Sequence, residues 1–185
     1  MDDVAAMAEV TKITVSRYLR EPQKVAAATG ERIRAALEAT GYVPNRQAGL
    51  LASGRSNIVA ALIPNLSHSI FGETVQALSE GLQGAGFELL LASTGYALDR
   101  EEDQLRTLLA WAPSALVVTG RHHSDAAQQM LLAAHRAGTP VVEIWDYHQE
   151  AESPFTQVGF DHREVGKTMA AHLIDSGCRR LAYLD

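Results

Sequence analysis

The chain has 185 residues, of which 46% are hydrophobic and 21% are charged. This composition is typical of folded globular proteins and excludes a disordered chain. A single cysteine, Cys178, excludes an intrachain disulfide framework and a multi-cysteine zinc site. No apolar run reaches the roughly 18–20 residues that cross a bilayer, and the first residues, Met1 to Asp3, are acidic where a signal peptide is basic. We therefore expect a cytoplasmic protein with no membrane partner.

The charge is distributed unevenly along the chain. The net charge is −6, yet residues 1–55 carry eight basic and six acidic side chains, a net of +2, and residues 56–185 carry eight basic and sixteen acidic side chains, a net of −8. A small basic head on an acidic body favours a protein whose head binds DNA. A chance fluctuation of surface charge remains the alternative.

Three short helices are predicted in the basic head. Asp3 is a candidate cap for a helix through about Ala8, and a third helix over about 27–40 is expected to stop at Gly41. The second helix is capped by Thr11 and spaces its apolar residues three and four apart, at Val15, Tyr18 and Leu19. Two short helices joined by a tight turn and braced by a third form a helix-turn-helix DNA-binding unit.

The outer face of the second helix carries the candidate DNA contacts. Arg17 can bind guanine through two hydrogen bonds, Lys12 can bind it more loosely, and Ile13 can touch a thymine methyl. The residues expected to bind phosphates are Thr11, Thr14, Ser16 and Arg20. For each residue taken singly a solvated helix face is the alternative, and their arrangement on one capped helix favours DNA binding.

Residues 45–55, NRQAGLLASGR, predict a helix too short to be stable alone. Gly49 inside it costs about 1 kcal/mol relative to alanine. Leu50 and Leu51 have no neighbouring sequence that buries them. This segment is therefore either a linker that folds only against a partner, or an ordinary linker whose leucines rest on the body.

From Asn57 onward, apolar runs alternate with amphipathic stretches. Strands are predicted at 58–63, 87–92, 115–119, 141–144 and 181–184, and helices at about 70–85, 99–110, 125–137 and 162–176. This alternation predicts an α/β domain with a parallel, doubly wound sheet. Ligands bind such sheets outside the carboxyl ends of the strands, which here are followed by the loops 64–71, 93–96, 120–124 and 146–148.

Enzyme motifs are weak. Gly81, Gly84 and Gly86 end a helix and do not join a strand to a helix, so they do not predict a phosphate loop. His122 and His123 lack a third metal ligand at a diagnostic spacing. No nucleophile elbow is present. We expect no enzyme activity, no cofactor and no metal site, although an enzyme on a doubly wound sheet stays an alternative because a fold does not determine a function.

Taken together, these features resemble the lactose-repressor (LacI/GalR) family of bacterial transcription regulators. The resemblance covers essentially the whole chain and is strongest in DVA at 3–5, VTKITVSRYL at 10–19 and GYVPNR at 41–46. It implies a helix-turn-helix head at 1–44, a hinge helix at 45–56 and, at 57–185, the first subdomain of a periplasmic-binding-protein-like sensor. Because the family's sensor has two similar subdomains, we expect the chain to be truncated before the second.

The resemblance also implies roles for individual residues. The family's base-reading side chains correspond to Lys12, Ile13 and Arg17, and its phosphate contacts also include Thr29 and Asn45. The leucine that wedges into the operator's minor groove corresponds to Leu51, which implies dimers that kink a near-palindromic operator. Small-molecule effectors are expected to act by shifting how the sensor positions the hinges.

One residue departs from the family pattern. Glu9 occupies the turn between the first two helices, where the family usually has glycine. A residue other than glycine is strained at positive φ. We therefore expect a less stable head.

Three further runs, TKITVSRYLR at 11–20, PVVE at 140–143 and VGFD at 158–161, resemble the gluconate-utilisation repressors of this family. The resemblance implies a sugar-acid effector, gluconate. The expected site has Arg121, His123 and Asp146 as polar contacts, with Phe71 and Tyr147 as apolar walls. The sequence thus predicts a transcriptional repressor modulated by a sugar acid. The alternative is a sugar-acid-binding module with a disabled DNA-binding head.

Overall fold

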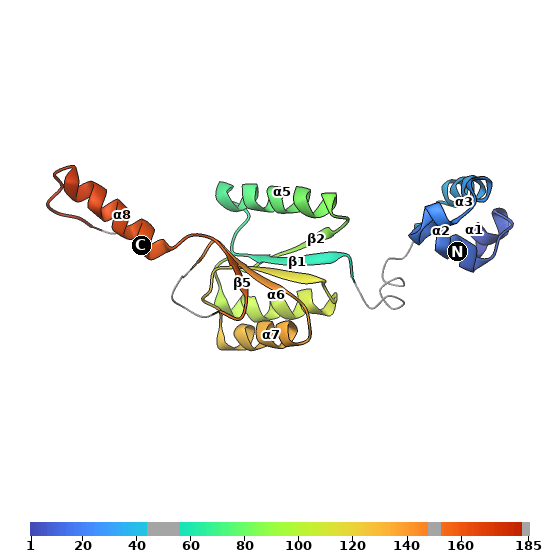
Figure 1. Ribbon diagram of the computed structural model, residues 1–185. Helices are drawn as coiled ribbons and strands as arrows, with labels where there is room; N and C mark the ends of the chain where they lie inside the picture. Colours follow the sequence, from blue (N-terminus) through green and yellow to red (C-terminus); the bar gives the residue numbers. More distant parts are fainter. Residues whose placement is uncertain (44–55, 148–152, 183–185) are drawn as a thin grey trace. The chain divides into compact units, whose positions relative to one another are not determined.

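The computed structural model describes residues 1–43, 56–147 and 153–182, and the chain separates into two compact units, Met1–Gly54 and Arg55–Asp185 (Figure 1). Apart from Ser56, the expected hinge at 45–56 lies outside the described residues. Asn45 and Leu51 lie outside them as well, so their roles stay predictions.

The first unit is helical. It consists of α1 (Asp2–Met7), α2 (Lys12–Arg20), the short 3-10 helix η1 (Pro22–Lys24) and α3 (Ala27–Thr40). The predicted cap of α2 is confirmed, because the Thr14 N–H donates to the Thr11 hydroxyl at 3.3 Å. The predicted end of α3 is also confirmed, since Gly41 adopts φ +60°. The predicted cap at Asp3 is wrong: α1 begins at Asp2, and both acidic residues lie in its first turn, where the helix dipole favours negative charge.

One small core joins the three helices of the head. Val4 of α1, Val15 of α2 and Ile33 of α3 are fully buried in the same cluster. The tight turn between α1 and α2 places Glu9 at φ +52°, the left-handed conformation in which a side chain is strained. The head is thus a packed helix-turn-helix with a residue other than glycine at positive φ in its turn.

The second unit contains a five-stranded sheet. Its strands are β1 (Ile58–Ile63), β2 (Glu88–Ser93), β3 (Ala115–Thr119), β4 (Val141–Ile144) and β5 (Thr156–Val158), all parallel, in the order β2-β1-β3-β4-β5. Helix α5 (Ser69–Gly84) covers one face, and α6 (Leu98–Ala110) and α7 (Asp125–Arg136) cover the other (Figure 1). The predicted doubly wound α/β architecture is confirmed.

Apolar side chains fill both layers between helices and sheet. Leu105, Leu116 and Leu131 are fully buried on the side of α6 and α7. Val59 and Val117 are buried on the opposite side, in a cluster that includes apolar residues of α5. The interior strand β1 is buried at five consecutive positions because helices cover both of its faces.

The C-terminal part differs from the sequence prediction. Leu181 and Ala182 are not in a strand, and the rest of the predicted strand 181–184 lies outside the described residues. The sheet instead gains β5, whose sequence TQV has no apolar run and which forms by pairing with β4. Helix α8 (His162–Asp175) follows it, capped by the Asp161 carboxylate. Within the described ranges, no helix combines the length and apolar character needed to span a membrane.

Candidate functional site

The outer face of α2 presents the three predicted base-reading side chains. Lys12 and Arg17 are exposed, and Ile13 is 71% exposed although it is apolar. Val15, on the opposite face of the same helix, is fully buried. Packing of α2 into the head core therefore leaves a cationic and apolar surface available to base edges.

The predicted phosphate contacts lie on or beside the same helix. Thr11 and Arg20 are exposed, while Thr14, Ser16 and Thr29 are half-buried. The Thr11 and Thr14 hydroxyls are 3.0 Å apart, and the Arg20 Nε donates to the Ser16 carbonyl at 3.3 Å. Hydroxyl and guanidinium groups thus flank the predicted base-reading side chains.

An ion pair on the head was not predicted from the sequence. The Lys12 ammonium contacts the Asp2 carboxylate, and both side chains are largely exposed. The hydrogen bond from Lys12 lowers the pKa of Asp2 below its ordinary value. The Asp2 carboxylate is therefore ionised at neutral pH, and it lies against a predicted base-reading lysine. Sequence gave no signal for this contact, because only the packing of α1 on α2 brings the two residues together.

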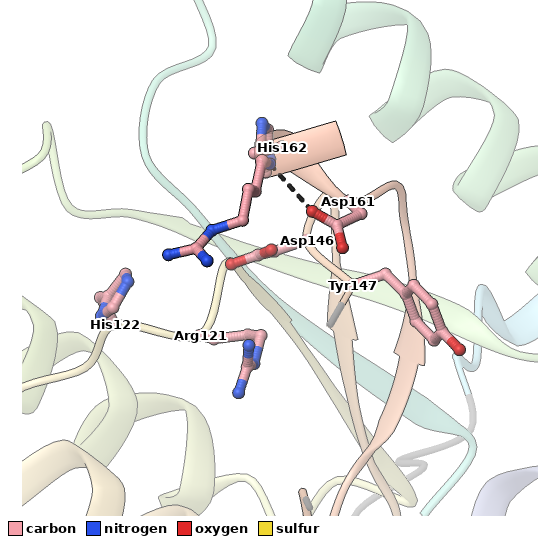
Figure 2. Close-up of a pocket in the computed structure, with 7 residues that line it drawn as sticks. Arg121, His122, Asp146, Tyr147, Asp161 and His162 are labelled. Atoms are coloured by element: carbon pink, nitrogen blue, oxygen red, sulfur yellow. Dashed lines mark hydrogen bonds between the residues drawn. The ribbon is translucent and has the colours of Figure 1, made fainter. Parts of the chain in front are cut away.

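In the second unit, a cavity of about 520 Å³ lies beyond the carboxyl ends of β3, β4 and β5. Its lining consists of Arg121, His122, Asp146, Tyr147, Asp161, His162 and Arg163. Figure 2 shows Asp146 between Arg121 and Asp161, with the Tyr147 ring directed away from Arg121. Three of the five predicted effector residues, Arg121, Asp146 and Tyr147, are thus brought together.

The other two predicted effector residues lie elsewhere. The His123 side chain is only 1% exposed and contacts Glu101, whereas its neighbour His122 lines the cavity. Phe71 packs edge-on against Trp145, with 5.9 Å between ring centroids, and does not line the cavity.

An aromatic row continues from Trp145 to the start of α8. The Trp145 and Phe160 ring centroids are 6.0 Å apart, and those of Phe160 and His162 are 4.5 Å apart. The Trp145 indole N–H donates to the Thr74 hydroxyl of α5 at 3.2 Å. Trp145 itself adopts φ +72°, a strained conformation of the kind that clusters at functional sites.

The sequence prediction missed the lining residues Asp161, His162 and Arg163. They follow β5, and because that strand was not predicted, these residues were not recognised as lying at a strand end. Two guanidinium and two carboxylate groups in one cavity can bind an anionic, hydroxylated molecule. One oxygen of Asp161 already accepts two backbone N–H groups of α8, at 2.9 and 3.1 Å. In the part of the chain that is described, no group of three or more His, Cys, Asp or Glu residues could hold a metal ion.

Two family models match the two units. Residues 1–45 match the bacterial regulatory proteins of the lacI family, and residues 56–185 match the periplasmic binding proteins and sugar binding domain of the LacI family.

Individual relatives agree with these matches. The HTH-type transcriptional regulators GntR of Escherichia coli K12 and of Pseudomonas aeruginosa are 36% and 37% identical over the whole chain, which covers 54% and 52% of their lengths. The chain therefore spans about half the length of these curated relatives. A crystal structure of a LacI-family regulator from Silicibacter pomeroyi is 40% identical with a TM-score of 0.84, over 97% of this chain and 52% of that one.

The fold is also similar to that of one chain in the crystal structure of the lac repressor dimer bound to operator and the anti-inducer ONPF. The TM-score is 0.78 at 24% identity, and the match covers 97% of this chain and 53% of that one. A helix-turn-helix head, a parallel α/β unit and matches to both family models lead to one conclusion: this chain belongs to the LacI family of bacterial regulatory proteins.

Proposed function

We propose that this chain belongs to a transcriptional repressor that binds a specific operator and responds to a sugar acid. The observation that carries this proposal is the outer face of α2, where Lys12, Ile13 and Arg17 are exposed while Val15 is fully buried. An exposed isoleucine contributes nothing to a hydrophobic core. Ile13 suits the thymine methyl groups of a major groove, and the cationic side chains on either side of it in the sequence suit the hydrogen-bond acceptors.

The proposed binding mode is that of a dimer on a near-palindromic operator. Each head reads one half-site through α2, and the hinge leucine, Leu51, wedges into the minor groove at the centre. Such a regulator works where the chromosome is, in the cytoplasm. Membership of a family of regulators argues against the enzyme alternative.

The proposed effector is gluconate, bound in the cavity at the carboxyl ends of β3, β4 and β5. Arg121 is placed to bind its carboxylate, and Asp146 to accept hydrogen bonds from its hydroxyls. Tyr147 contributes an apolar wall. The resemblance to gluconate-utilisation repressors supports this choice of ligand, and the cavity volume falls within the range of small-molecule sites.

The DNA-binding function is tested by selecting bound duplexes from a random library at physiological salt, with and without gluconate. Salt is held constant because phosphate contacts dominate affinity. Enrichment of a palindrome supports the repressor. If no sequence is enriched while calorimetry detects gluconate binding, the alternative of a sensor with a disabled head replaces it.

A matched pair of variants tests the reading helix on the selected operator. Arg17→Ala is expected to cost about 1–3 kcal/mol on the operator and less on random DNA. Arg34→Ala removes the same charge from α3, where Arg34 is paired with Glu31 and Glu38, and should change both affinities little. Equal losses on operator and random DNA for Arg17→Ala would rule out base reading.

The effector site is tested by calorimetry with gluconate. Arg121→Ala is expected to weaken binding, because it removes the guanidinium proposed to hold the carboxylate. Arg136→Ala removes an exposed arginine of α7 that does not line the cavity and serves as the control. Equal affinities of the two variants would exclude this cavity as the gluconate site.

A further inference from the structure

A buried acid–histidine pair includes His123, the neighbour of the cavity-lining residue His122. The Glu101 Oε1 and the His123 Nδ1 are 2.6 Å apart, and the two side chains are 10% and 1% exposed. The second carboxylate oxygen, Oε2, accepts the backbone N–H of Ser124 at 2.9 Å. Burying a carboxylate is costly unless its oxygens are paired, and here each oxygen has a partner on the same loop.

This pair joins two elements that are distant in the sequence. Glu101 lies in the first turn of α6, where the helix dipole favours its negative charge. His123 lies in the loop between β3 and α7, followed by Ser124, whose hydroxyl caps α7 by accepting the Ala127 N–H at 3.1 Å. Glu101 therefore fixes the end of the loop from which α7 starts.

The other end of the loop is also fixed. The Gly120 N–H donates to the Ile144 carbonyl of β4 at 2.9 Å, and Gly120 turns the chain at φ +77°. Between the two fixed ends lie only Arg121 and His122, and both line the cavity. The position of the Arg121 guanidinium thus depends on the contacts that hold the two ends of the loop.

We propose that Glu101 is the positioning residue of the effector site: by holding the His123 ring and the Ser124 N–H, it places Arg121 for the effector's carboxylate. This inference rests on the proposed gluconate site. Glu101 does not line the cavity, so it acts through the loop and not by touching the ligand. The competing explanation is that the pair only joins α6 to α7, in which case its loss lowers stability without moving Arg121.

Glu101→Gln is a suitable perturbation, because glutamine keeps the shape of glutamate and changes the hydrogen bonding. The wild-type carboxylate can accept from both the His123 Nδ1–H and the Ser124 N–H. Glutamine has one accepting oxygen and one donating NH₂, so either one contact is lost or the His123 proton moves to Nε2. That nitrogen is buried and has no hydrogen-bond partner among the described residues.

The matched control is Glu102→Gln. It makes the same chemical change one residue later on α6, at a side chain that is 38% exposed and pairs with Arg106. We expect Glu101→Gln to weaken gluconate binding roughly tenfold, as for the loss of one buried hydrogen bond. Glu102→Gln should leave gluconate affinity unchanged.

A double-mutant cycle separates positioning from general destabilisation. If Glu101 acts through Arg121, then Glu101→Gln costs nothing further in an Arg121→Ala background. The ¹⁵N NMR signals of the His123 ring should change with the lost contact, and the backbone amide signals of Arg121 and His122 should shift in Glu101→Gln but not in Glu102→Gln. Additive losses in the cycle, or unshifted loop amides, would overturn the positioning role.

Failure of the effector assignment gives a different result. If the unaltered chain binds no gluconate, or if Arg121→Ala binds it normally, the proposed gluconate site is wrong. The loop amides are observed without any ligand, so they still decide whether Glu101 positions Arg121.

Discussion

Truncating Ile33 to alanine should unfold the head and leave the second unit intact. Ile33 is fully buried in the cluster that also contains Val4 and Val15. Large-to-small substitutions at such positions combine lost transfer free energy with a cavity, and we expect a loss of about 3 kcal/mol. A core in a unit of this size supplies no more than about 3–5 kcal/mol of net stability. The variant therefore loses most of the free energy of unfolding of the head.

The two units can be observed separately. Both tryptophans, Trp111 and Trp145, belong to the second unit, so tryptophan fluorescence follows that unit alone. Far-ultraviolet circular dichroism follows the helices of both. In thermal unfolding of Ile33→Ala, we expect part of the helical signal to be lost at a lower temperature, while the transition seen by tryptophan fluorescence is unchanged. Operator binding should be lost and gluconate binding retained.

The matched control is Ile13→Ala, which removes the same atoms from a side chain that is 71% exposed. It should change stability by less than about 0.5 kcal/mol and weaken operator binding only. The reasoning is refuted if Ile33→Ala retains the head's thermal transition, or if its tryptophan transition falls in parallel with the helical signal.

Three further substitutions test individual contacts. Asp2→Asn frees Lys12, so operator affinity should rise and its salt slope should steepen by up to about one unit in a filter-binding series. Because the pKa of Asp2 is lowered, the ion pair persists at neutral pH and weakens only as pH falls through that lowered pKa, so the difference from wild type is expected at pH 7. Glu9→Gly relieves a side chain at φ +52° and should stabilise the head by up to about 1 kcal/mol, measured by circular dichroism. Gly159→Ala places a methyl group 2.5 Å from the Asp146 backbone nitrogen and should abolish gluconate binding in calorimetry.

Each of these substitutions has a control or a contradicting outcome. Asp3→Asn removes an equal charge from the adjacent residue, and an equal gain in affinity would mean that net charge acts and not the Lys12 contact. A head destabilised by Glu9→Gly would show that the turn is not strained. Gly72→Ala, at a position with open space, should leave gluconate binding unchanged. Normal binding by Gly159→Ala would contradict the close approach of the two segments that follow β4 and β5.

Local patterns in the sequence were sufficient for most helices and strands. The cap at Thr11 and the stop at Gly41 depend on the chemistry of single residues, and both are observed. Strands β1, β3 and β4 have the predicted bounds because each is a short, mainly apolar run. The spacing of Val15 and Leu19 also determined which face of α2 is exposed, since helical periodicity needs no information from elsewhere in the chain.

Packing between distant segments decided the rest. Strand β5 has no apolar run and exists because the edge of β4 accepts it, which also brings Asp161 and His162 to the cavity. His122 and His123 are adjacent in a loop without periodicity, and only the carboxylate of Glu101, on another helix, determines that His123 turns inward while His122 lines the cavity. Sequence thus determined which residues form each element and which helix face is free, because those properties depend on neighbours within a few positions. The tertiary structure alone decided which side chains meet at the cavity, because each of those contacts joins segments that no local pattern relates.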